Sequence, residues 1–551
     1  MTLHVRWLGR VPYREALALQ QAMFEHGTED HLLLLEHPHV FTHGPRADLA
    51  ANVKVDPASV AAELVSVKRG GDVTYHGPGQ LVGYPIVNVP NALGAGDHVR
   101  AIQHLIVGTL QELGLVDVGC LADYPGVWVG VSGPHPRKIC AIGVRLAHAR
   151  TMHGFALNVR TDMRYMRDYI VPCGIGDKPV TSLAEEGITA DLATVAGIVA
   201  RRAGEIWGSG EVERQDVAWK LRPDDLSPFS RGEGPGTVVR AAARLQQAGV
   251  SDGLAIATRK PEWLRPKVTI GREVLALKKT VRDHGLVTVC EEAGCPNLSD
   301  CWADGTATFM VLGERCTRAC GFCLVDTQKP TAPAADEPRR VAAAIREMGL
   351  AHAVLTMVAR DDLADGGFAH VAACVAAIRE ARPGTMIETL VSDAKGEEAS
   401  LALLFADGPG RPDVFNHNVE TVARLQRAVR PSAGYARSLG VLARAKAAGM
   451  TVKTGFMVGL GETEAEITGL LHDLAAIGTN IVTIGQYLRP TSNHLPVARW
   501  ADPAEFGEWK LLGESLGIGH VEASPLTRSS YHAKQAADAV HVGTDATPSF
   551  V

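Results

Sequence analysis

The pattern of hydrophobic and polar positions differs between the two halves of this chain of 551 residues. In the first half, runs rich in Val, Ile and Leu are short and interrupted by glycine, as in GQLVGYPIVNV (79–89) and ICAIGVRL (139–146). A helical pattern stands at YREALALQQAMFEHG (13–27). Short runs bounded by glycine are typical of strands in a mixed sheet. The first half is therefore predicted to be a mixed α/β domain.

The second half alternates more regularly between strand-like and helical patterns. The strand-like runs are TFMVLG (308), AVLTMV (353), MIETLV (386), DVFNHN (413), VKTGFMVG (452) and NIVTIGQY (480). Alanine-rich amphipathic segments separate most of them, among them HVAACVAAIREA, ETVARLQRAV, RSLGVLARAKAAG and EAEITGLLHDLAAIG. Strand, helix and strand in succession predict right-handed βαβ units and a parallel sheet or barrel. Glu388, Asn416, His417 and Gln486 fall near predicted strand ends, where a β/α barrel forms its active site.

Between these halves the composition changes. RPDDLSPFSRGEGPG (222–236) is rich in Pro, Gly, Ser and Asp, and a helical TVVRAAARLQQAG follows it. A chain of this length exceeds what one hydrophobic core usually organises. We therefore predict a first domain over 1–212, a linker over 213–258 and a second domain over 259–551.

Composition limits the classes of function. The chain is 46% hydrophobic and 21% charged with a formal net charge of −6, which argues against a dedicated nucleic-acid binder. No apolar run approaches the roughly 20 residues that span a bilayer, and the start has neither signal peptide nor transit segment. A cytoplasmic protein with no membrane and no nucleic-acid partner is expected. In a reducing cytosol, clustered cysteines favour ligation or catalysis over disulfides.

Six of the ten cysteines lie between 290 and 323. ERCTRACGFC (314–323) spaces Cys316, Cys320 and Cys323 as C-x3-C-x2-C. Three such thiolates can each ligate a separate iron of a cubane and leave the fourth iron open. Zinc is the alternative, but structural zinc prefers four closed ligands in paired C-x2-C knuckles, which neither triplet supplies.

C-x3-C-x2-C resembles the signature of the radical S-adenosylmethionine (SAM) enzymes. The resemblance implies a partial, TIM-like β/α barrel and a [4Fe–4S] cluster on Cys316, Cys320 and Cys323. It further implies that the open iron chelates SAM, and that one-electron reduction then yields a 5′-deoxyadenosyl radical.

A second triplet lies upstream, in CEEAGCPNLSDCW, where Cys290, Cys295 and Cys301 are spaced C-x4-C-x5-C. It resembles the auxiliary-cluster motif of lipoyl synthase, in which a serine of a near-terminal RSSYHA (528–533) is the fourth ligand. The resemblance implies a second [4Fe–4S] cluster with Ser530 as that ligand, and Ser529 as the less favoured choice. VARDD, with Ala359, and ETLVSDAKG depart from the family pattern near the strand ends. Cys374, in a helical run, is expected to be a buried packing residue.

The first half carries RGGDVTYHGPGQ, KICAIGVR, HGFALNV and VPCGI…VTSL. By itself a cysteine before glycine is more often inert than nucleophilic, unless a nearby lysine favours its thiolate. Together these motifs resemble lipoyl(octanoyl) transferase, a relative of the biotin and lipoate ligases, over about 5–210. The resemblance implies a biotin/lipoate-ligase-like α/β fold and a catalytic pair, Cys173 and Lys138. The implied acyl-binding residues are Arg69, Gly70, Gly71, Asp72, Val73, Thr74, Tyr75, His76, Ala141, Ile142, Gly143, Gly154, Phe155 and Ala156.

Three further expectations concern this half. Cys140, two residues from Lys138, would share its face of a regular strand, and we interpret it as a packing residue. His76 and His153 are candidates for orienting the site, or for structural hydrogen bonds. Candidate docking charges for an acidic carrier, with a merely solvated face as the alternative, are Arg137, Arg145, Arg160, Arg164 and Arg167.

The resemblances imply a fusion of two successive enzymes of lipoate assembly. The first would transfer octanoate from octanoyl-acyl carrier protein to a carrier lysine, and the second would insert sulfur at carbons six and eight. The implied cofactors are two [4Fe–4S] clusters and SAM. The implied partners are lipoyl domains of 2-oxoacid dehydrogenase E2 subunits, the glycine cleavage H protein and a ferredoxin- or flavodoxin-type reductant. The alternatives are that the first half only docks carriers, or that the second half is another radical enzyme such as a methylthiolase.

Overall fold

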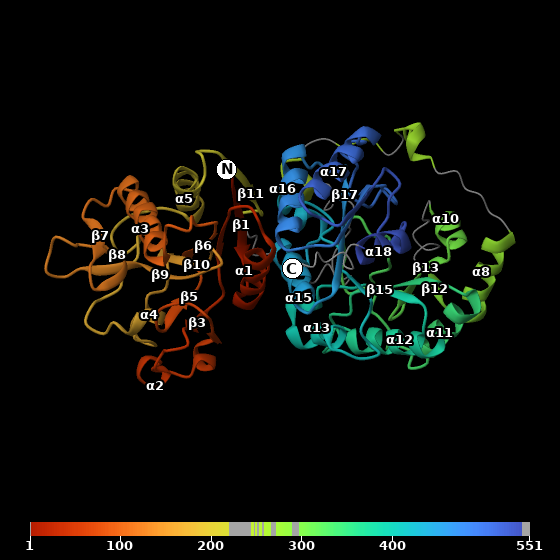
Figure 1. Ribbon diagram of the computed structural model, residues 1–551, viewed down its shortest axis with the longest axis horizontal. Helices are drawn as coiled ribbons and strands as arrows, with labels where there is room; N and C mark the ends of the chain where they lie inside the picture. Colours follow the sequence, from red (N-terminus) through yellow and green to blue (C-terminus); the bar gives the residue numbers. More distant parts are fainter. Residues whose placement is uncertain are drawn as a thin grey trace, which may run out of the picture. The chain divides into compact units, whose positions relative to one another are not determined.

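The chain, seen in a computed structural model, divides into two compact units, Met1–Trp219 and Lys220–Val551 (Figure 1). The structure describes residues 2–219, 244–246, 248–250, 253–255, 258–265, 272–288 and 297–542. Most of the predicted linker lies outside these residues, and part of its beginning forms strand β11 (Val212–Asp216). The domain limits drawn from the sequence stay predictions.

The first unit is built on an eight-stranded sheet of order β11-β1-β2-β6-β10-β9-β8-β7. Strand β1 pairs in parallel with β2 and β11, and the other neighbouring strands are antiparallel. A smaller sheet has the order β4-β3-β5. This confirms the mixed α/β prediction. The elements are β1 (Leu3–Arg10), α1 (Tyr13–His26), β2 (His31–Glu36), β3 (Val40–His43), α2 (Leu49–Asn52), η1 (Pro57–Val60), β4 (Glu63–Ser66), β5 (Thr74–His76), β6 (Gln80–Ile86), α3 (Ala95–Glu112), β7 (Val118–Leu121), β8 (Tyr124–Val129), β9 (Arg137–Ala147), β10 (Arg150–Asn158), α4 (Arg164–Arg167), η2 (Pro172–Gly174), α5 (Leu192–Trp207) and β11.

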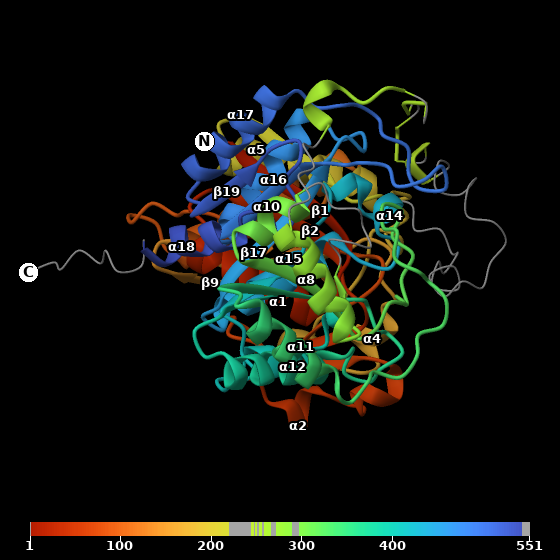
Figure 2. The ribbon, with the colours of Figure 1, turned by 90° about the vertical axis from the view of Figure 1, so that its right-hand side faces the viewer.

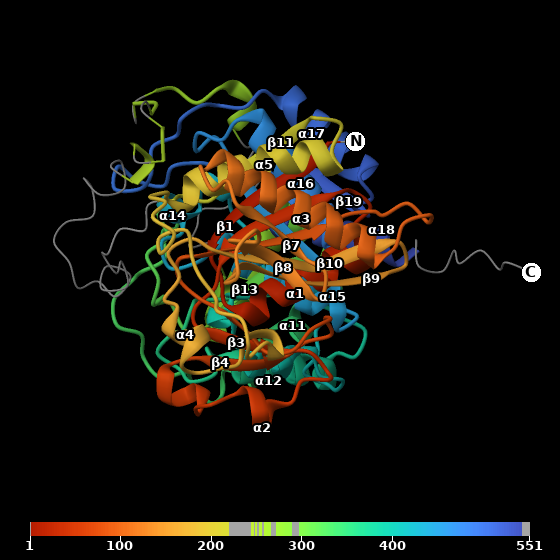
Figure 3. The same ribbon diagram turned by 90° about the vertical axis from the view of Figure 1, so that its left-hand side faces the viewer.

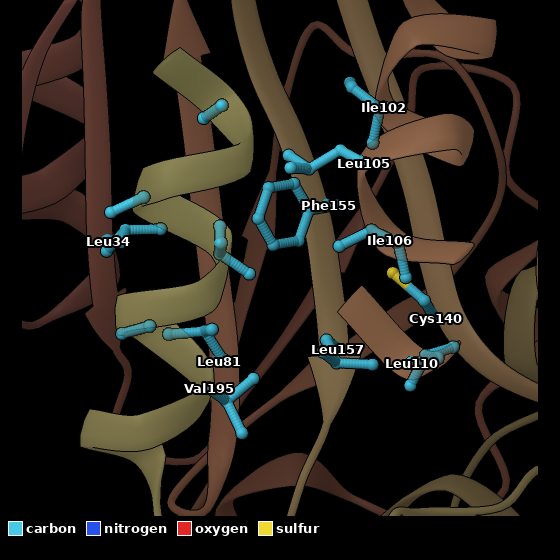
Figure 4. Close-up of a cluster of buried hydrophobic side chains, with 14 of the residues drawn as sticks. Leu34, Leu81, Ile102, Leu105, Ile106, Leu110, Cys140, Phe155, Leu157 and Val195 are labelled. Carbon is cyan, nitrogen blue, oxygen red and sulfur yellow. The ribbon is translucent and has the colours of Figure 1, made fainter. Parts of the chain in front are cut away.

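Helices α3 and α5 lie side by side over one face of this sheet (Figure 3). Between them and the strands lies the main core, where Leu105 and Ile106 of α3 meet Phe155 and Leu157 of β10 (Figure 4). Strand β2, with the sequence HLLLLE, is buried along its whole length because it lies between β1 and β6 inside the sheet. Helix α1 packs against β6 and β10.

The second unit holds one eight-stranded sheet whose strands follow chain order from β12 to β19. Strand β12 is antiparallel to β13, and all later neighbours are parallel. Within the described residues β19 does not pair with β12, so the sheet is open, as a partial barrel requires. The elements are η3 (Glu262–Leu264), α8 (Arg272–Asp283), β12 (Val287–Thr288), α10 (Leu298–Ala303), β13 (Thr306–Val311), α11 (Glu337–Met348), β14 (His352–Met357), α12 (Phe368–Ala381), β15 (Met386–Leu390), η4 (Ala394–Gly396), α13 (Glu398–Phe405), β16 (Val414–Asn416), η5 (Ala423–Leu425), α14 (Gln426–Val429), α15 (Tyr435–Ala447), β17 (Thr451–Val458), α16 (Glu464–Ala476), β18 (Ile481–Gln486), α17 (Pro503–Ser515), β19 (His520–Ala523) and α18 (Ala533–Val542).

All six predicted strands are present, and the helix expected over ETVARLQRAV is confirmed only from Ala423 onward. Only the short η5 and α14 form there. The backbone of Glu420 instead bonds to Gly455 and Met457, both in β17, at 2.9 Å each. The Gln426 amide donates to the carbonyl of Thr421 at 2.7 Å. Glu420 and Thr421 are held by these bonds, and the helical segment begins after them, at Ala423.

Capping fixes the helices that follow the strands. At the start of α16 the Thr463 hydroxyl accepts from Glu466 N at 3.2 Å, and the Glu466 carboxylate accepts from Thr463 N at 2.8 Å.

In the second unit, helix α8 lies beside α10 and α11 (Figure 2). None of the helices described here is long and apolar enough to cross a membrane.

Candidate active sites

Lys138 and Cys173 meet in the first unit. Lys138 Nζ donates to Cys173 Sγ at 3.2 Å, and the ammonium lies 5.7 Å from the centre of the Trp128 ring. Lys138 is 4% exposed, so little water screens this contact. Cys173 lies in the turn η2 with a φ of 58°, and its N–H donates to Val73 O at 2.7 Å. A left-handed conformation in a residue with a side chain is strained, and such strain concentrates at functional sites.

The pair opens into a cavity of about 580 Å³, a volume that includes its mouth. The sequence-predicted residues that line the cavity, with Lys138 and Cys173, are Arg69, Gly70, Gly71, Asp72, Thr74, His76, Ala141, Ile142, Gly143, Gly154, Phe155 and Ala156.

Val73 and Tyr75 do not line the cavity. Both belong to a separate buried cluster with Phe41 and Ile170. The reason is that side chains alternate along β5, so Thr74 and His76 face the cavity and Tyr75 faces away from it. Val73 still contributes through its carbonyl, which accepts the Cys173 N–H.

Sequence reasoning missed Tyr13, Tyr84 and Pro125, which also line the cavity. Burial raises the pKa of Tyr13 to about 12, and the Tyr84 hydroxyl lies 2.7 Å from His37 Nε2. The alternation in GQLVGYPI could have indicated Tyr84, since Gly83 occupies the opposite face against Phe155. Tyr13, at the first turn of α1, gave no such signal.

Two histidines complete the wall. Burial lowers the pKa of His153 to about 3 and holds the pKa of His76 well below its usual value, so both rings are neutral. His76 Nδ1 lies 2.9 Å from Gln80 Oε1, whereas His153 Nδ1 is buried without a hydrogen-bond partner among the described residues. Neutral rings beside aromatic walls suit an uncharged, largely apolar ligand.

Cys140 does not share the face of Lys138, and the sequence expectation on this point is wrong. The register between β8 and β9 shifts at this point, because Trp128 pairs with Lys138 whereas Val127 pairs with Cys140. The extra residue, Ile139, forms a bulge, so Ile139 and Cys140 both enter the main core. Burial raises the pKa of the Cys140 thiol to about 12. Cys140 is a packing residue, as expected.

The candidate docking arginines are largely engaged. Arg137 pairs with Glu186 at 2.8 Å and Arg164 with Asp162 at 2.6 Å. Arg167 pairs with Glu185, and Arg145 lies 5.0 Å from the centre of the Phe24 ring. These acidic partners offset much of the positive charge on which docking would depend.

In the second unit, Cys316, Cys320 and Cys323 lie in the loop after β13. The loop is fixed by Cys316 N to Asp326 O at 2.8 Å and by His494 Nε2 to Cys323 O at 2.9 Å. Burial, with the neighbouring thiols, raises the pKa of Cys320 to about 12 and that of Cys323 to about 11. The three thiols are half-buried and raise one another's pKa, so a bound cation would stabilise their thiolates, and the donor set fits an iron–sulfur cluster.

A buried ion pair anchors the same loop. Arg318, between the first two cysteines, bonds Asp361 at 2.8 Å and Asp393 at 2.6 Å. Burial alone would raise the pKa of Asp393, but the Arg318 guanidinium outweighs burial and lowers it. Thr317 N and Oγ1 both donate to Ala359 O, at 3.0 and 2.9 Å. Ala359 takes part through its backbone carbonyl, and Asp393 is present in ETLVSDAKG. The departures from the family pattern therefore leave these contacts intact.

Glu388 and Asn416 belong to a buried polar network inside the sheet. Lys453 Nζ donates to Glu388 Oε2 at 2.9 Å, and Asn416 Nδ2 donates to Glu388 Oε1 at 2.7 Å. Burial would raise the pKa of Glu388, but Lys453 and His352 outweigh burial and hold it at about 2. The Glu388 carboxylate is therefore ionised at neutral pH.

His417 and Gln486 do not offer polar groups to a site, contrary to expectation. His417 bonds Val391 O at 2.8 Å and the Ser438 hydroxyl at 2.9 Å. Gln486 donates to Val458 O at 3.1 Å and accepts from Ala501 N at 2.9 Å. Both side chains tie loops to the sheet.

The upstream triplet is described only at Cys301, on α10; Cys290 and Cys295 lie outside the described residues. Asn297 Nδ2 donates to Leu526 O at 2.7 Å, which joins α10 to the segment that carries Ser530. Burial raises the pKa of Tyr531, and the neighbouring Asp300 and Cys301 add to the shift. The structure thus brings Cys301 beside the RSSYHA segment.

Ser529 and Ser530 differ in their surroundings. The Ser529 hydroxyl accepts from Asn416 Nδ2 at 3.1 Å and donates to Asn418 Oδ1 at 3.3 Å. Ser529 thus belongs to the network of Glu388. No such bond engages the Ser530 hydroxyl within the part of the chain that is described.

Comparison with known proteins agrees with this geometry. The model of the lipoyl protein ligase A/B catalytic domain matches residues 12–202. The radical SAM superfamily matches 310–474, and the N-terminal domain of lipoyl synthase matches 240–295. The molecule therefore joins a lipoate-ligase-like domain to a radical SAM domain, which confirms the fold class.

Relatives identify the second domain. A lipoyl synthase of Rubrobacter xylanophilus is 52% identical over 278 residues, covering 50% of this chain and 86% of that protein. One of Mycobacterium tuberculosis is 48% identical over 297 residues, covering 54% and 94%. The chain belongs to the lipoyl synthase family. A solved bi-partite lipoate protein ligase of Thermoplasma acidophilum covers 40% of this chain and 89% of its own, at 17% identity and a TM-score of 0.34.

Proposed function

We propose that the chain is a bifunctional enzyme that completes lipoyl groups on carrier proteins. The first domain transfers octanoate from octanoyl-acyl carrier protein to a carrier lysine through Cys173. The second inserts two sulfur atoms, at carbons six and eight of that chain. The observation that supports the first step most directly is the 3.2 Å contact of Lys138 Nζ with Cys173 Sγ at the cavity.

The transfer needs one nucleophile and one proton carrier. Cys173 supplies the nucleophile, and Lys138, in contact with its sulfur, is placed to take up the proton of the thiol. The thiolate attacks the thioester carbonyl, a bond from carbon to Cys173 Sγ forms, and the carrier thiol leaves with a proton from Lys138. The acceptor amine then attacks the acyl-enzyme, its proton passes to Lys138, and Cys173 leaves as the thiolate.

The cavity is suited to hold the acyl chain during both steps. Its walls carry Phe155, Ala156 and the neutral rings of His76 and His153. Burying methylene groups there stabilises the bound chain by about 0.8 kcal/mol each. The strained backbone of Cys173, held by Val73 O, fixes the sulfur at the cavity edge.

In the second domain Cys316, Cys320 and Cys323 would hold one [4Fe–4S] cluster. Cys290, Cys295, Cys301 and Ser530 would hold another. With SAM bound, the first set of cysteines would hold the cluster that supplies one-electron chemistry for hydrogen abstraction, and the second set would hold the one that supplies sulfur. The engagement of Ser529 with Asn416 and Asn418 supports Ser530 as the oxygen ligand. Arg318 holds the first cysteine loop in place through Asp361 and Asp393.

The proposed partners follow from these two reactions. They are octanoyl-acyl carrier protein, lipoyl domains of 2-oxoacid dehydrogenase E2 subunits, the glycine cleavage H protein and a ferredoxin- or flavodoxin-type reductant. A cytoplasmic location fits the oxygen-sensitive chemistry and the reduced thiols.

One experiment tests the whole proposal. The anaerobic, reconstituted protein is given octanoyl-acyl carrier protein, a lipoyl-domain acceptor, SAM and a reductant, and the acceptor is weighed. An octanoyl mass shift followed by the lipoyl mass is expected. An acceptor that stays unmodified, or one that gains lipoate only when octanoylated beforehand, would leave the first half a docking module.

A further inference from the structure

The segment that carries Ser530 is joined by two side-chain hydrogen bonds to α10, the helix that holds the third cysteine of the upstream triplet. Asn297 Nδ2, at the start of α10, donates to Leu526 O at 2.7 Å. Gln535 Nε2, on α18, donates to Asp304 Oδ2, at the end of α10, at 2.8 Å. One bond precedes the two candidate ligands in the chain and the other follows both, so the two ligands lie on segments that are held together at either side.

A third contact reaches the residue before Ser530 from inside the sheet. Asn416, the last residue of β16, is fully buried. Its Nδ2 donates to the Glu388 carboxylate at 2.7 Å and to the Ser529 hydroxyl at 3.1 Å. A carboxylate only accepts hydrogen bonds, so Asn416 must turn Nδ2 toward Glu388, and the orientation of its amide is fixed. Lys453 Nζ in turn holds the other oxygen of that carboxylate at 2.9 Å.

The Ser529 hydroxyl uses both of its hydrogen-bonding roles. It accepts from Asn416 and donates to Asn418 Oδ1 at 3.3 Å. Ser529 and Ser530 are neighbours in the turn that leads into α18. The Ser530 hydroxyl forms no hydrogen bond with the residues that the structure describes. Fixing Ser529 therefore limits the directions that the next side chain can take, while leaving the oxygen of Ser530 available.

We propose that Asn416 is a positioning residue that holds Ser529 against the sheet and thereby directs the Ser530 hydroxyl toward the cluster that it shares with Cys301. This inference rests on the proposed function, which makes Ser530 the oxygen ligand. A serine oxygen is a weak ligand for iron–sulfur chemistry, so its bond to iron depends on how accurately the side chain is held. Loss of a residue that holds a metal ligand in place typically changes metal affinity by about 10- to 100-fold. The iron bound by Ser530 should therefore be released faster when Asn416 is replaced.

The test measures the rate of iron release to a ferrous chelator, without oxygen, from the reconstituted full-length chain. A background with Cys316, Cys320 and Cys323 all replaced by Ala leaves the auxiliary cluster and removes the cluster to which SAM would bind. In this background Asn416→Leu is expected to start with wild-type iron content and to release its first iron about tenfold faster. Ser530→Ala should release that iron faster still, or lack it from the outset.

The double variant separates positioning from a general loss of structure. Iron content and release in Asn416→Leu/Ser530→Ala should match those of Ser530→Ala alone, because a residue that acts only through Ser530 has no effect once that oxygen is gone. Should Asn416→Leu fail to fold, Ser529→Ala removes the same hydrogen bond from its other end and takes its place in the comparison.

Tyr435→Phe is the matched control. It removes another buried hydrogen bond of the second unit, from the Tyr435 hydroxyl to Asp473 Oδ2 at 2.7 Å, which joins α15 to α16 rather than to the serine segment. Iron release in this variant should stay at the wild-type rate.

Each other outcome overturns the proposal. Iron release at the wild-type rate in Asn416→Leu does so, as does an acceleration that persists when Ser530 is already alanine, or an equal acceleration in Tyr435→Phe. If Ser530→Ala itself changes neither iron content nor release, the ligand set of the proposed function is refuted and this inference with it. A failure confined to Asn416 and Ser529 leaves the proposed function intact.

Discussion

The two candidate sites differ in how much of their chemistry the polypeptide itself carries. In the first unit one fold assembles the proposed nucleophile, the lysine beside it and the cavity, with Lys138 Nζ 3.2 Å from Cys173 Sγ. In the second unit the loop of Cys316, Cys320 and Cys323 holds thiols whose pKa burial raises. The chemistry proposed for the first site therefore needs no cofactor. The chemistry proposed for the second site needs a cluster that supplies charge and electrons.

The largest expected effect breaks the second site alone. Replacing all three of Cys316, Cys320 and Cys323 by Ala should abolish sulfur insertion and remove about half of the bound iron, because three of the proposed ligands of one cluster are lost. Octanoyl transfer should continue, since Cys173 and Lys138 belong to the other unit. Iron analysis and acceptor mass spectrometry measure both. Iron that stays at the wild-type level would contradict two separate clusters.

The converse change is Cys173→Ser. Octanoyl transfer should fall by about 10³-fold or more, since a hydroxyl is a far weaker nucleophile than a thiolate. Conversion of a pre-octanoylated acceptor to the lipoyl form should be unaffected. Acyl-enzyme mass and transfer rate are the measurements. Cys140→Ala is the matched control and should retain transfer; loss of the acyl-enzyme in that variant instead would move the nucleophile to Cys140.

A third change tests the scaffold of the second unit. Glu388→Gln leaves the Lys453 ammonium buried without its carboxylate, which should lower the free energy of unfolding by about 3 kcal/mol. The pKa of Glu388, about 2 in the folded chain, lies below its usual 4.5. The pair therefore stabilises fully above pH 4.5, and its contribution disappears as the pH falls toward 2.

Urea unfolding at several pH values measures this effect. The advantage of the wild-type chain over Glu388→Gln should shrink as the pH is lowered below 4.5. The exposed Glu380→Gln, on α12, is the control and should change neither stability nor its pH dependence. A difference between wild type and Glu388→Gln that stays constant down to acid pH would show that the pair is not ionised.

The smallest expected effect separates two adjacent serines. Ser530→Ala should slow sulfur insertion by about 10- to 100-fold, as expected when one weak ligand of a cluster is lost. Ser529→Ala removes bonds to Asn416 and Asn418 but no proposed ligand, so iron and sulfide content should stay the same. Sulfide content and single-turnover rates measure both variants. The reverse ranking would make Ser529 the ligand.

Sequence alone predicted the architecture because periodicity and local motifs encode it. Strands such as MIETLV alternate with amphipathic helices, and the resulting parallel sheet is present. Most of the residues predicted to bind the acyl group likewise line one cavity. The predictions that failed concern His417 and Gln486, whose polar groups form hydrogen bonds within the second unit. Nothing local indicates that both polar ends of Gln486 are used by Val458 O and Ala501 N.

Sequence alone also does not tell which face of a strand lines the cavity. Thr74 and Tyr75 carry equal weight in the motif, yet only the strand's orientation decides that Thr74 lines the cavity. Tyr13 enters the site from a helix far from any motif. Such contacts arise from tertiary packing, for which a single sequence holds no pattern.

The bulge at Ile139 has a consequence for how this enzyme can change. In a regular strand Lys138 and Ala141, an odd number of residues apart, would face opposite ways. One inserted residue lets both reach the same wall while Cys140 stays inside the core. Deleting Ile139 would leave Lys138 and Ala141 two residues apart, a spacing that a strand without a bulge places on one face. The chain could therefore lose Ile139 and the bulge together, whereas a strand that kept Ile139 and lost the bulge would turn Lys138 and Ala141 to opposite faces.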